Sequence, residues 1–105
     1  MNNAVAQLKA VIFLRDPDQA DCRQAAEMLG AQVIREYVED RDRTGIRSID
    51  KRPALRLMFD ELRASRDTKY VIATSPSRLT RRADVMATIL RKIEAAGATL
   101  IFSQS

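Results

Sequence analysis

Four arginines stand at turns between predicted elements, and side chains of this type can together bind a phosphate group. They are Arg15, Arg52, Arg78 and Arg81. A guanidinium group presents a planar fork of donors that matches pairs of phosphate oxygens. Several such groups around one phosphate would also stabilise the charge that develops during phosphoryl transfer. The alternative interpretation is that each arginine is an ordinary solvated charge, which is the usual situation for this residue type.

The residue types that are missing narrow the possible chemistry. The 105-residue chain has no histidine and a single cysteine, Cys22. It therefore lacks the commonest metal ligand and a common general base, and it can form neither an internal disulfide nor a cysteine-based zinc site. We expect no metal and no cofactor, so that any chemistry rests on carboxylates, hydroxyls, arginines or lysines. Cys22 is expected to pack as a small apolar residue on the inner face of a helix.

The charge balance favours a polyanionic partner, with nucleic acid the leading candidate. The formal net charge is +4, and 14 of the 18 basic residues are arginine. Arginine codons are also preferred in many GC-rich genomes, so this indication is modest by itself. An apolar fraction of 46% and a charged fraction of 30% are typical of soluble globular proteins. No apolar run approaches the length of a membrane span and no secretory signal is evident, so we expect a cytoplasmic protein without membrane contact.

Strands and helices are predicted to alternate along the whole chain. Apolar runs and alternation predict strands over 9–14, 32–38, 70–73 and 99–102. Helical spacing predicts helices over 21–29, 53–66 and 81–96, with Gly30 and Gly97 as stop signals after two of them. This order predicts one α/β domain over 1–105: three layers, with a mostly parallel four-stranded sheet and helices on both faces.

The predicted fold places the arginines at one edge. In such sheets, ligands bind outside the carboxyl ends of the strands. The segments expected there are 15–20, 39–52 and 74–82, which are also rich in arginine and turn residues. If the third helix starts early enough, Arg78 and Arg81 share a face of it.

Four short motifs occur in an order that resembles the catalytic domain of resolvase/invertase-type serine recombinases. The Arg-Leu-x-Arg element is the most specific, and the resemblance covers essentially the whole chain. The motifs are Phe13-Leu14-Arg15 with Gln19, Thr44-Gly45 followed by Asp50-Lys51-Arg52-Pro53, Ser75-Pro76-Ser77-Arg78-Leu79-Thr80-Arg81, and Gly97-Ala98-Thr99-Leu100.

The resemblance implies a resolvase-like fold and a link to DNA recombination and the integration of mobile elements. In that family a serine hydroxyl attacks a DNA phosphodiester without metal or cofactor, and arginines bind the phosphate. It implies phosphate-binding roles for the four arginines named above and supporting roles for Gln19 and Thr44. Members of the family generally act as dimers and tetramers.

The sequence departs from the family in three ways. Asp16 and Pro17 stand where the attacking serine is expected, so no hydroxyl is present there. Asp16 and Asp18 are better explained as helix caps or as partners of Arg15. Ser75 and Ser77 replace the lysine and the acidic residue of the arginine motif. Third, we expect a single domain without the family's long dimerisation helix and without its C-terminal DNA-binding domain, because the last predicted strand is followed by only three residues.

We therefore expect a recombinase-like protein that does not cut DNA but keeps the arginine pocket. It would bind DNA weakly and non-specifically, and would form a homo-oligomer or pair with an active recombinase. One alternative is an active recombinase that uses a relocated hydroxyl of Ser75, Ser77 or Thr44, although these residues fit ordinary turns. Others are a fragment of a longer recombinase, or a small α/β domain whose arginines do unrelated surface work.

Overall fold

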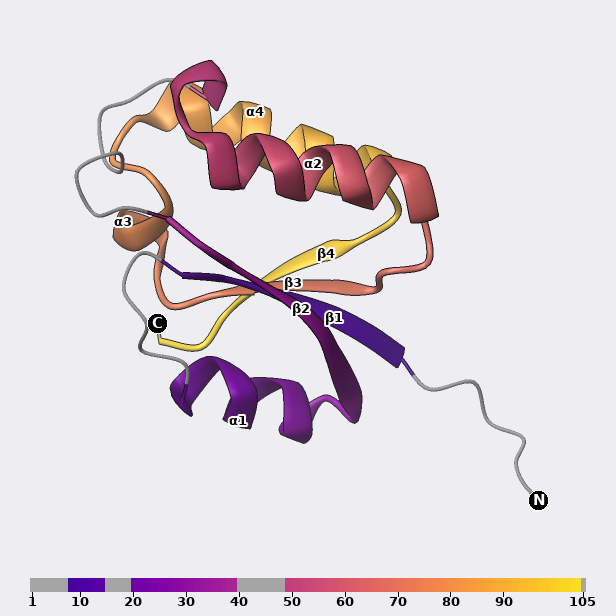
Figure 1. The fold of residues 1–105 in the computed structure, drawn as a ribbon. Coiled ribbons are helices and arrows are strands. Elements are labelled where there is room, and N and C mark those ends of the chain that lie inside the picture. The colour runs from indigo at the N-terminus through magenta and orange to yellow at the C-terminus, as the bar shows by residue number, and fades with distance from the viewer. Residues whose placement is uncertain (1–7, 15–19, 40–48, 105) are drawn as a thin grey trace.

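The computed structural model describes residues 8–14, 20–39 and 49–104 (Figure 1). A parallel sheet in the order β2-β1-β3-β4 forms the middle layer. Helix α1 covers one face, and α2 and α4 cover the other. The predicted α/β class, with its four parallel strands and helices on both faces, is confirmed. The elements are β1 (Leu8–Leu14), α1 (Ala20–Met28), β2 (Ala31–Val38), η2 (Ile49–Lys51), α2 (Pro53–Ser65), β3 (Tyr70–Ala73), α3 (Pro76–Leu79), α4 (Ala83–Ala95) and β4 (Thr99–Phe102).

Strand β1 is central and is covered on both faces, which explains its nearly unbroken apolar run. Val11 and Phe13 point into the larger core cluster, beneath α2 and α4. Ala10, Ile12 and Leu14 point into the smaller cluster, beneath α1. Because successive side chains of β1 point to opposite faces of the sheet, this one strand contributes residues to both core clusters.

Local signals fix the ends of the helices. Pro53 occupies the first position of α2, where its fixed φ suits a helix and its missing N–H is not needed. Arg66 ends α2 in the left-handed region, with φ of 56° and its N–H bonded to the Leu62 carbonyl. Gly30 and Gly97 follow α1 and α4 with φ of 70° and 85°, a conformation that glycine adopts without steric cost. Both predicted glycine stop signals are confirmed.

The segment 74–82, which is rich in turn residues, contains the short helix α3. Pro76 starts this helix, and the buried side chain of Leu79 anchors it in the larger core. Thr80 is extended, and its hydroxyl accepts a hydrogen bond from the Arg82 N–H. Helix α4 consequently begins at Ala83 rather than at Arg81.

This boundary corrects the prediction that Arg78 and Arg81 share a face of one helix. Arg78 belongs to α3, whereas Arg81 lies between α3 and α4. The extended residue Thr80 separates the two segments.

Within the described residues, no helix is long and apolar enough to cross a membrane.

The edge strand β2 is fastened to α2 by a cluster of three side chains. The Tyr37 hydroxyl donates a hydrogen bond to Glu61, and Arg35 Nη1 donates a second one at 3.0 Å. The Arg35 guanidinium also lies 5.2 Å from the centre of the Tyr37 ring. Burial raises the pKa of the Tyr37 phenol well above its ordinary value of 10.0, and the hydrogen bond to Glu61 adds to that rise.

A tyrosine with a raised pKa stabilises the fold below pH 10, and that stability is lost as the pH rises further. We expect the phenolate absorbance of a Tyr70→Phe variant, which leaves Tyr37 as its one tyrosine, to titrate with a midpoint above 10.0. Glu61→Gln in the same background should lower that midpoint. A midpoint at or below 10.0 in the parent would contradict the described cluster.

Neighbouring residues of α4 give a matched test of the larger core. Ile89 is fully buried, whereas Leu90 is 41% exposed. Ile89→Ala removes buried methyl groups and leaves a cavity, so the free energy of unfolding should fall by about 2–5 kcal/mol. Leu90→Ala should lower it by less than about 1 kcal/mol. Urea denaturation of the two variants measures the difference, and equal losses would show that α4 is rotated from the described orientation.

Candidate functional site

All four strands run in one direction, so their carboxyl ends meet at one edge of the sheet (Figure 1). Helices α1, α2 and α4 also begin at this edge, because each follows the end of a strand. We call this the carboxyl edge. It is the place where ligands bind in open parallel sheets.

Arg52 lies at the carboxyl edge, directly before α2, and its side chain is completely buried. Its Nε is 2.9 Å and its Nη2 is 2.8 Å from the two carboxylate oxygens of Glu39, which is also buried. The guanidinium lies 5.8 Å from the centre of the Phe13 ring. The interpretation of Arg52 as a solvated surface charge is therefore wrong.

Glu39 is held in place by the sheet itself. Its backbone N–H donates to the Leu14 carbonyl at 2.7 Å, which extends the pairing of β1 and β2 by one step. The carboxylate thus starts from a fixed backbone position and meets Arg52 across 13 residues of chain. Sequence reasoning missed Glu39, although an acidic residue directly after a strand at the carboxyl edge is a usable signal.

One nitrogen of Arg52 is left over from this pair. Among the described residues, Nη1 is buried and has no hydrogen-bond partner. A buried donor without a partner costs about 1–3 kcal/mol, and more when it is charged. The arrangement therefore provides one unused, charged donor that an anionic oxygen would satisfy.

The segment after β3 contributes hydroxyls and one exposed arginine. Ser75 Oγ and Ser77 Oγ lie 3.4 Å apart, and Arg81 is exposed. The position of Arg78 in α3 is described, but its side chain is not. Of the site residues predicted from the sequence, the structure describes the side chains of Arg52, Ser75, Ser77 and Arg81. The other predicted residues lie outside the described ranges: Arg15, Asp16, Pro17, Asp18, Gln19 and Thr44.

Cys22 lies beneath the carboxyl edge, in the smaller core. Its Sγ is 3.8 Å from Thr74 Oγ1 and 3.7 Å from Ser103 Oγ, and the side chain has no solvent exposure. The prediction that Cys22 packs as a small apolar residue is confirmed. Among the described residues, no group of three or more acidic, cysteine or histidine side chains is arranged to hold a metal ion.

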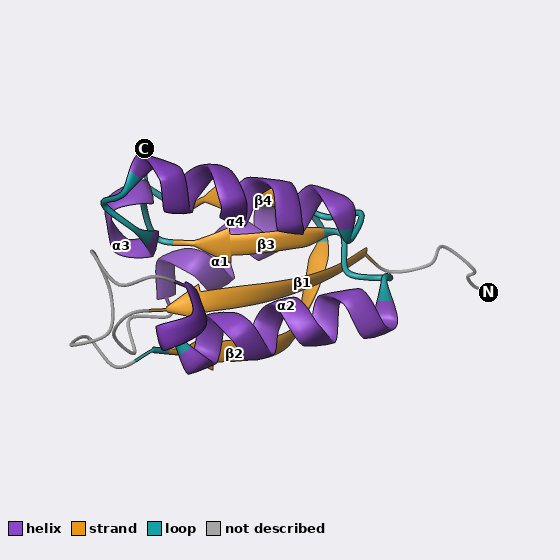
Figure 2. Cartoon of the chain, turned by 90° about the horizontal axis from the view of Figure 1, so that it is seen from above, coloured by secondary structure: helices purple, strands orange, loops and turns teal. Residues whose placement is uncertain are grey.

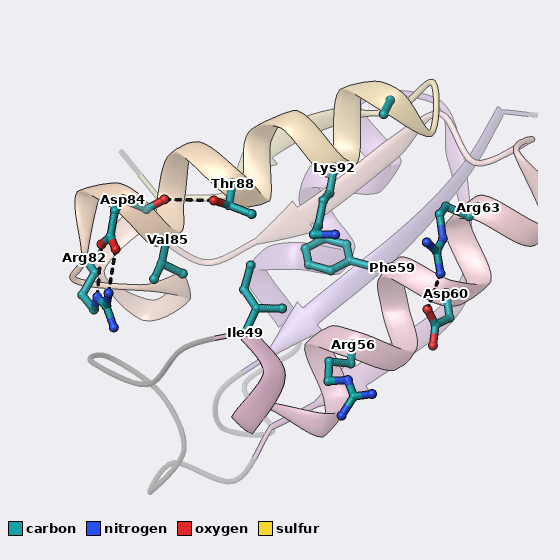
Figure 3. Close-up of a pocket in the computed structure, with 11 residues that line it drawn as sticks. Ile49, Arg56, Phe59, Asp60, Arg63, Arg82, Asp84, Val85, Thr88 and Lys92 are labelled. Carbon is teal, nitrogen blue, oxygen red and sulfur yellow. Dashed lines mark hydrogen bonds and ion pairs between the residues drawn. The ribbon is translucent and has the colours of Figure 1, made fainter.

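A groove of about 590 Å³ runs between α2 and α4 (Figure 3). Its floor is apolar, with Ile49, Phe59 and Val85, and its rim is charged. Arg63 pairs with Asp60, and Arg82 pairs with Asp84. The rim also contains Arg56 and Lys92, and the groove is completed by Thr88 and Ala95.

The charges of the rim are held in place by local contacts. Two hydrogen bonds from Arg82 lower the pKa of the Asp84 carboxyl, which therefore stays ionised at neutral pH. The Lys92 ammonium lies 5.7 Å from the centre of the Phe59 ring. Sequence reasoning did not find this groove, because its two walls come from separate helices, and even the nearest residues of these walls, Arg63 and Arg82, are distant in the sequence.

Several solved structures resemble the chain, among them two serine recombinases. One is the C-terminal catalytic domain of ISC1926 TnpA, an IS607-like serine recombinase, with a TM-score of 0.69 and 20% identity over 93% of this chain and 69% of that one. The other is a serine recombinase from Sulfolobus solfataricus, with a TM-score of 0.55 and 12% identity over 95% of this chain and 71% of that one. At these identities the likeness concerns the fold. A comparison with curated protein sequences gave no match.

The sequence itself matches one protein family over most of its length. Residues 16–105 match the family of the resolvase N-terminal domain. The matched span contains Arg52, the segment after β3 and both walls of the groove. The resemblance to serine recombinases and the predicted resolvase-like fold are both confirmed. The chain belongs to the resolvase N-terminal domain family of serine recombinases.

Proposed function

We propose that this domain takes part in DNA recombination by binding DNA phosphate at the carboxyl edge without cutting the strand. The unused Nη1 of Arg52 carries the proposal, since it is a buried guanidinium donor with no hydrogen-bond acceptor among the described residues. A phosphodiester oxygen satisfies such a donor with a short, charge-assisted hydrogen bond. Arg81, exposed at the same edge, would supply a further phosphate contact.

Because Arg52 is paired with Glu39, we expect it to bind a phosphate oxygen through a directed hydrogen bond rather than to attract anions from a distance. Glu39 cancels the charge of the guanidinium and fixes its plane. Arg52 would therefore act as an oriented donor, and attraction over a longer range would come from exposed residues such as Arg81. In the proposed pocket, Arg15 and Arg78 would complete the set, with Gln19 and Thr44 in support.

The absence of cleavage is proposed from the residue types along the chain. Asp16 and Pro17 offer no hydroxyl in the place where the family has its serine. Ser75 and Ser77 lie within hydrogen-bond distance of each other, and the sequence holds no histidine to activate either one. A domain of this kind would work beside an active recombinase subunit that supplies the nucleophile, or as a homo-oligomer.

Incubation of the protein with supercoiled plasmid should give no nicks and no covalent protein–DNA adduct. The electrophoretic mobility of the plasmid and mass spectrometry of the digested protein measure these two outcomes. An adduct on Ser75, Ser77 or Thr44 would show instead that the domain is an active recombinase with a relocated hydroxyl.

Binding to a duplex oligonucleotide should be weak, independent of sequence and strongly dependent on salt. The logarithm of the DNA affinity falls linearly with the logarithm of the salt concentration. Arg81→Ala should make this slope less steep by about one unit, because one phosphate contact is lost. Arg91→Ala, an equal change at an exposed position towards the far end of α4, is the matched control. Equal effects of the two substitutions would place phosphate contact away from the carboxyl edge.

Variants of the buried pair of Arg52 and Glu39 can distinguish a role in the stability of the fold from a role in DNA binding. Glu39→Gln leaves the Arg52 guanidinium buried without its counter-charge, so the free energy of unfolding should fall by about 3–5 kcal/mol. The double variant Glu39→Leu with Arg52→Met should recover much of this loss, because no charge then remains buried. We expect the double variant, measured by fluorescence anisotropy, to bind DNA several-fold more weakly than the parent. Unchanged binding would remove Arg52 from the site.

A further inference from the structure

We propose that the groove between α2 and α4 binds an amphipathic helix of a partner protein, one with an apolar stripe flanked by acidic residues. This inference goes beyond phosphate binding at the carboxyl edge and does not depend on it. The groove lies between the two helices that cover this face of the sheet (Figure 3).

The shape of the groove fits a helix lying along it. Helices α2 and α4 lie side by side on one face of the sheet and begin at the same edge (Figure 2). Groove residues on α4 extend from Asp84 to Ala95, which at the helical rise is roughly 16 Å, or three turns. Thr88 and Ala95 are small, so this wall leaves room for side chains that enter from a third helix.

The floor favours apolar side chains of the occupant. Ile49, Phe59 and Val85 are contributed by η2, α2 and α4 respectively. Phe59 and Val85 belong to the larger core, and Ile49 packs against it. Apolar side chains spaced three and four residues apart on one helix would extend this core outward, as helix-in-groove recognition does elsewhere.

The rim favours acidic side chains. Of the described residues that line the groove, four are cations and two are carboxylates: Arg56, Arg63, Arg82 and Lys92, and Asp60 and Asp84. Asp60 and Asp84 already pair with arginines of the rim. Lys92 contacts the Phe59 ring, and no described carboxylate forms an ion pair with it. A glutamate beside the apolar stripe would supply that counter-charge.

The same features argue against DNA as the occupant. A phosphate backbone would leave Ile49 and Phe59 without apolar contacts and would approach the carboxylates of Asp60 and Asp84. An acidic amphipathic helix would cover the apolar floor and also give Lys92 a carboxylate partner, so a protein partner is favoured.

The test uses three synthetic 16-residue peptides and fluorescence anisotropy with the full chain. The first carries leucine at helical spacing with flanking glutamates, the second replaces the glutamates by lysines, and the third has the composition of the first with its leucines scrambled. We expect the first peptide to bind at least ten-fold more tightly than the other two. Equal affinity of all three, or no binding of the first, would overturn the proposal.

Variants locate the binding in the groove. Lys92→Glu reverses the charge of the rim, and Thr88→Trp fills the groove from a partly exposed position. Each substitution should weaken the binding of the first peptide at least ten-fold. Circular dichroism of the variants checks that they are folded. Lys69→Glu makes the same charge change at an exposed position outside the groove and should leave binding unchanged.

Two further outcomes would assign the groove to another occupant. If a DNA duplex displaces the peptide from the parent chain, and Lys92→Glu abolishes DNA binding, the groove is a nucleic-acid site and the proposal is wrong. If sedimentation shows self-association that Lys92→Glu abolishes, the occupant is a second copy of this chain. Weaker DNA binding by Arg81→Ala, with peptide binding intact, would separate this groove from the proposed phosphate site.

Discussion

The buried ion pair of Arg52 and Glu39 fixes the geometry on which the carboxyl edge depends. Two charges without solvent exposure are tolerated when their mutual contacts are close and well directed, as these are. The pair joins the residue after β2 to the residue directly before α2, and the Phe13 ring of β1 lies beside it. The start of α2 is thereby set relative to the sheet, and so is one wall of the groove.

Much of the fold follows from signals that are local in the sequence. The apolar run of β1 predicts a strand covered on both faces, and Pro53, Gly30 and Gly97 mark helix boundaries through their backbone preferences. These signals hold because each residue acts on its own φ or on neighbours one turn away.

The features that sequence reasoning missed depend on contacts between distant residues. Glu39 directly follows a predicted strand, but it also opens a stretch with many charges, so its position alone does not show that its carboxylate meets Arg52. The serines and proline before Arg78 are typical of a turn, and the burial of Leu79 is what makes the segment helical. The groove has no pattern of its own, because it arises from the separation of two helices that the sheet positions.

All three longer helices begin at the carboxyl edge, and this shared direction has an electrostatic consequence. The peptide dipoles of each helix add up to roughly half a positive charge at its first turn. Three such ends at one edge make the local potential positive through the backbone alone, before any side chain is counted. A positive contribution to the potential at this edge is therefore a property of the topology, independent of the arginines.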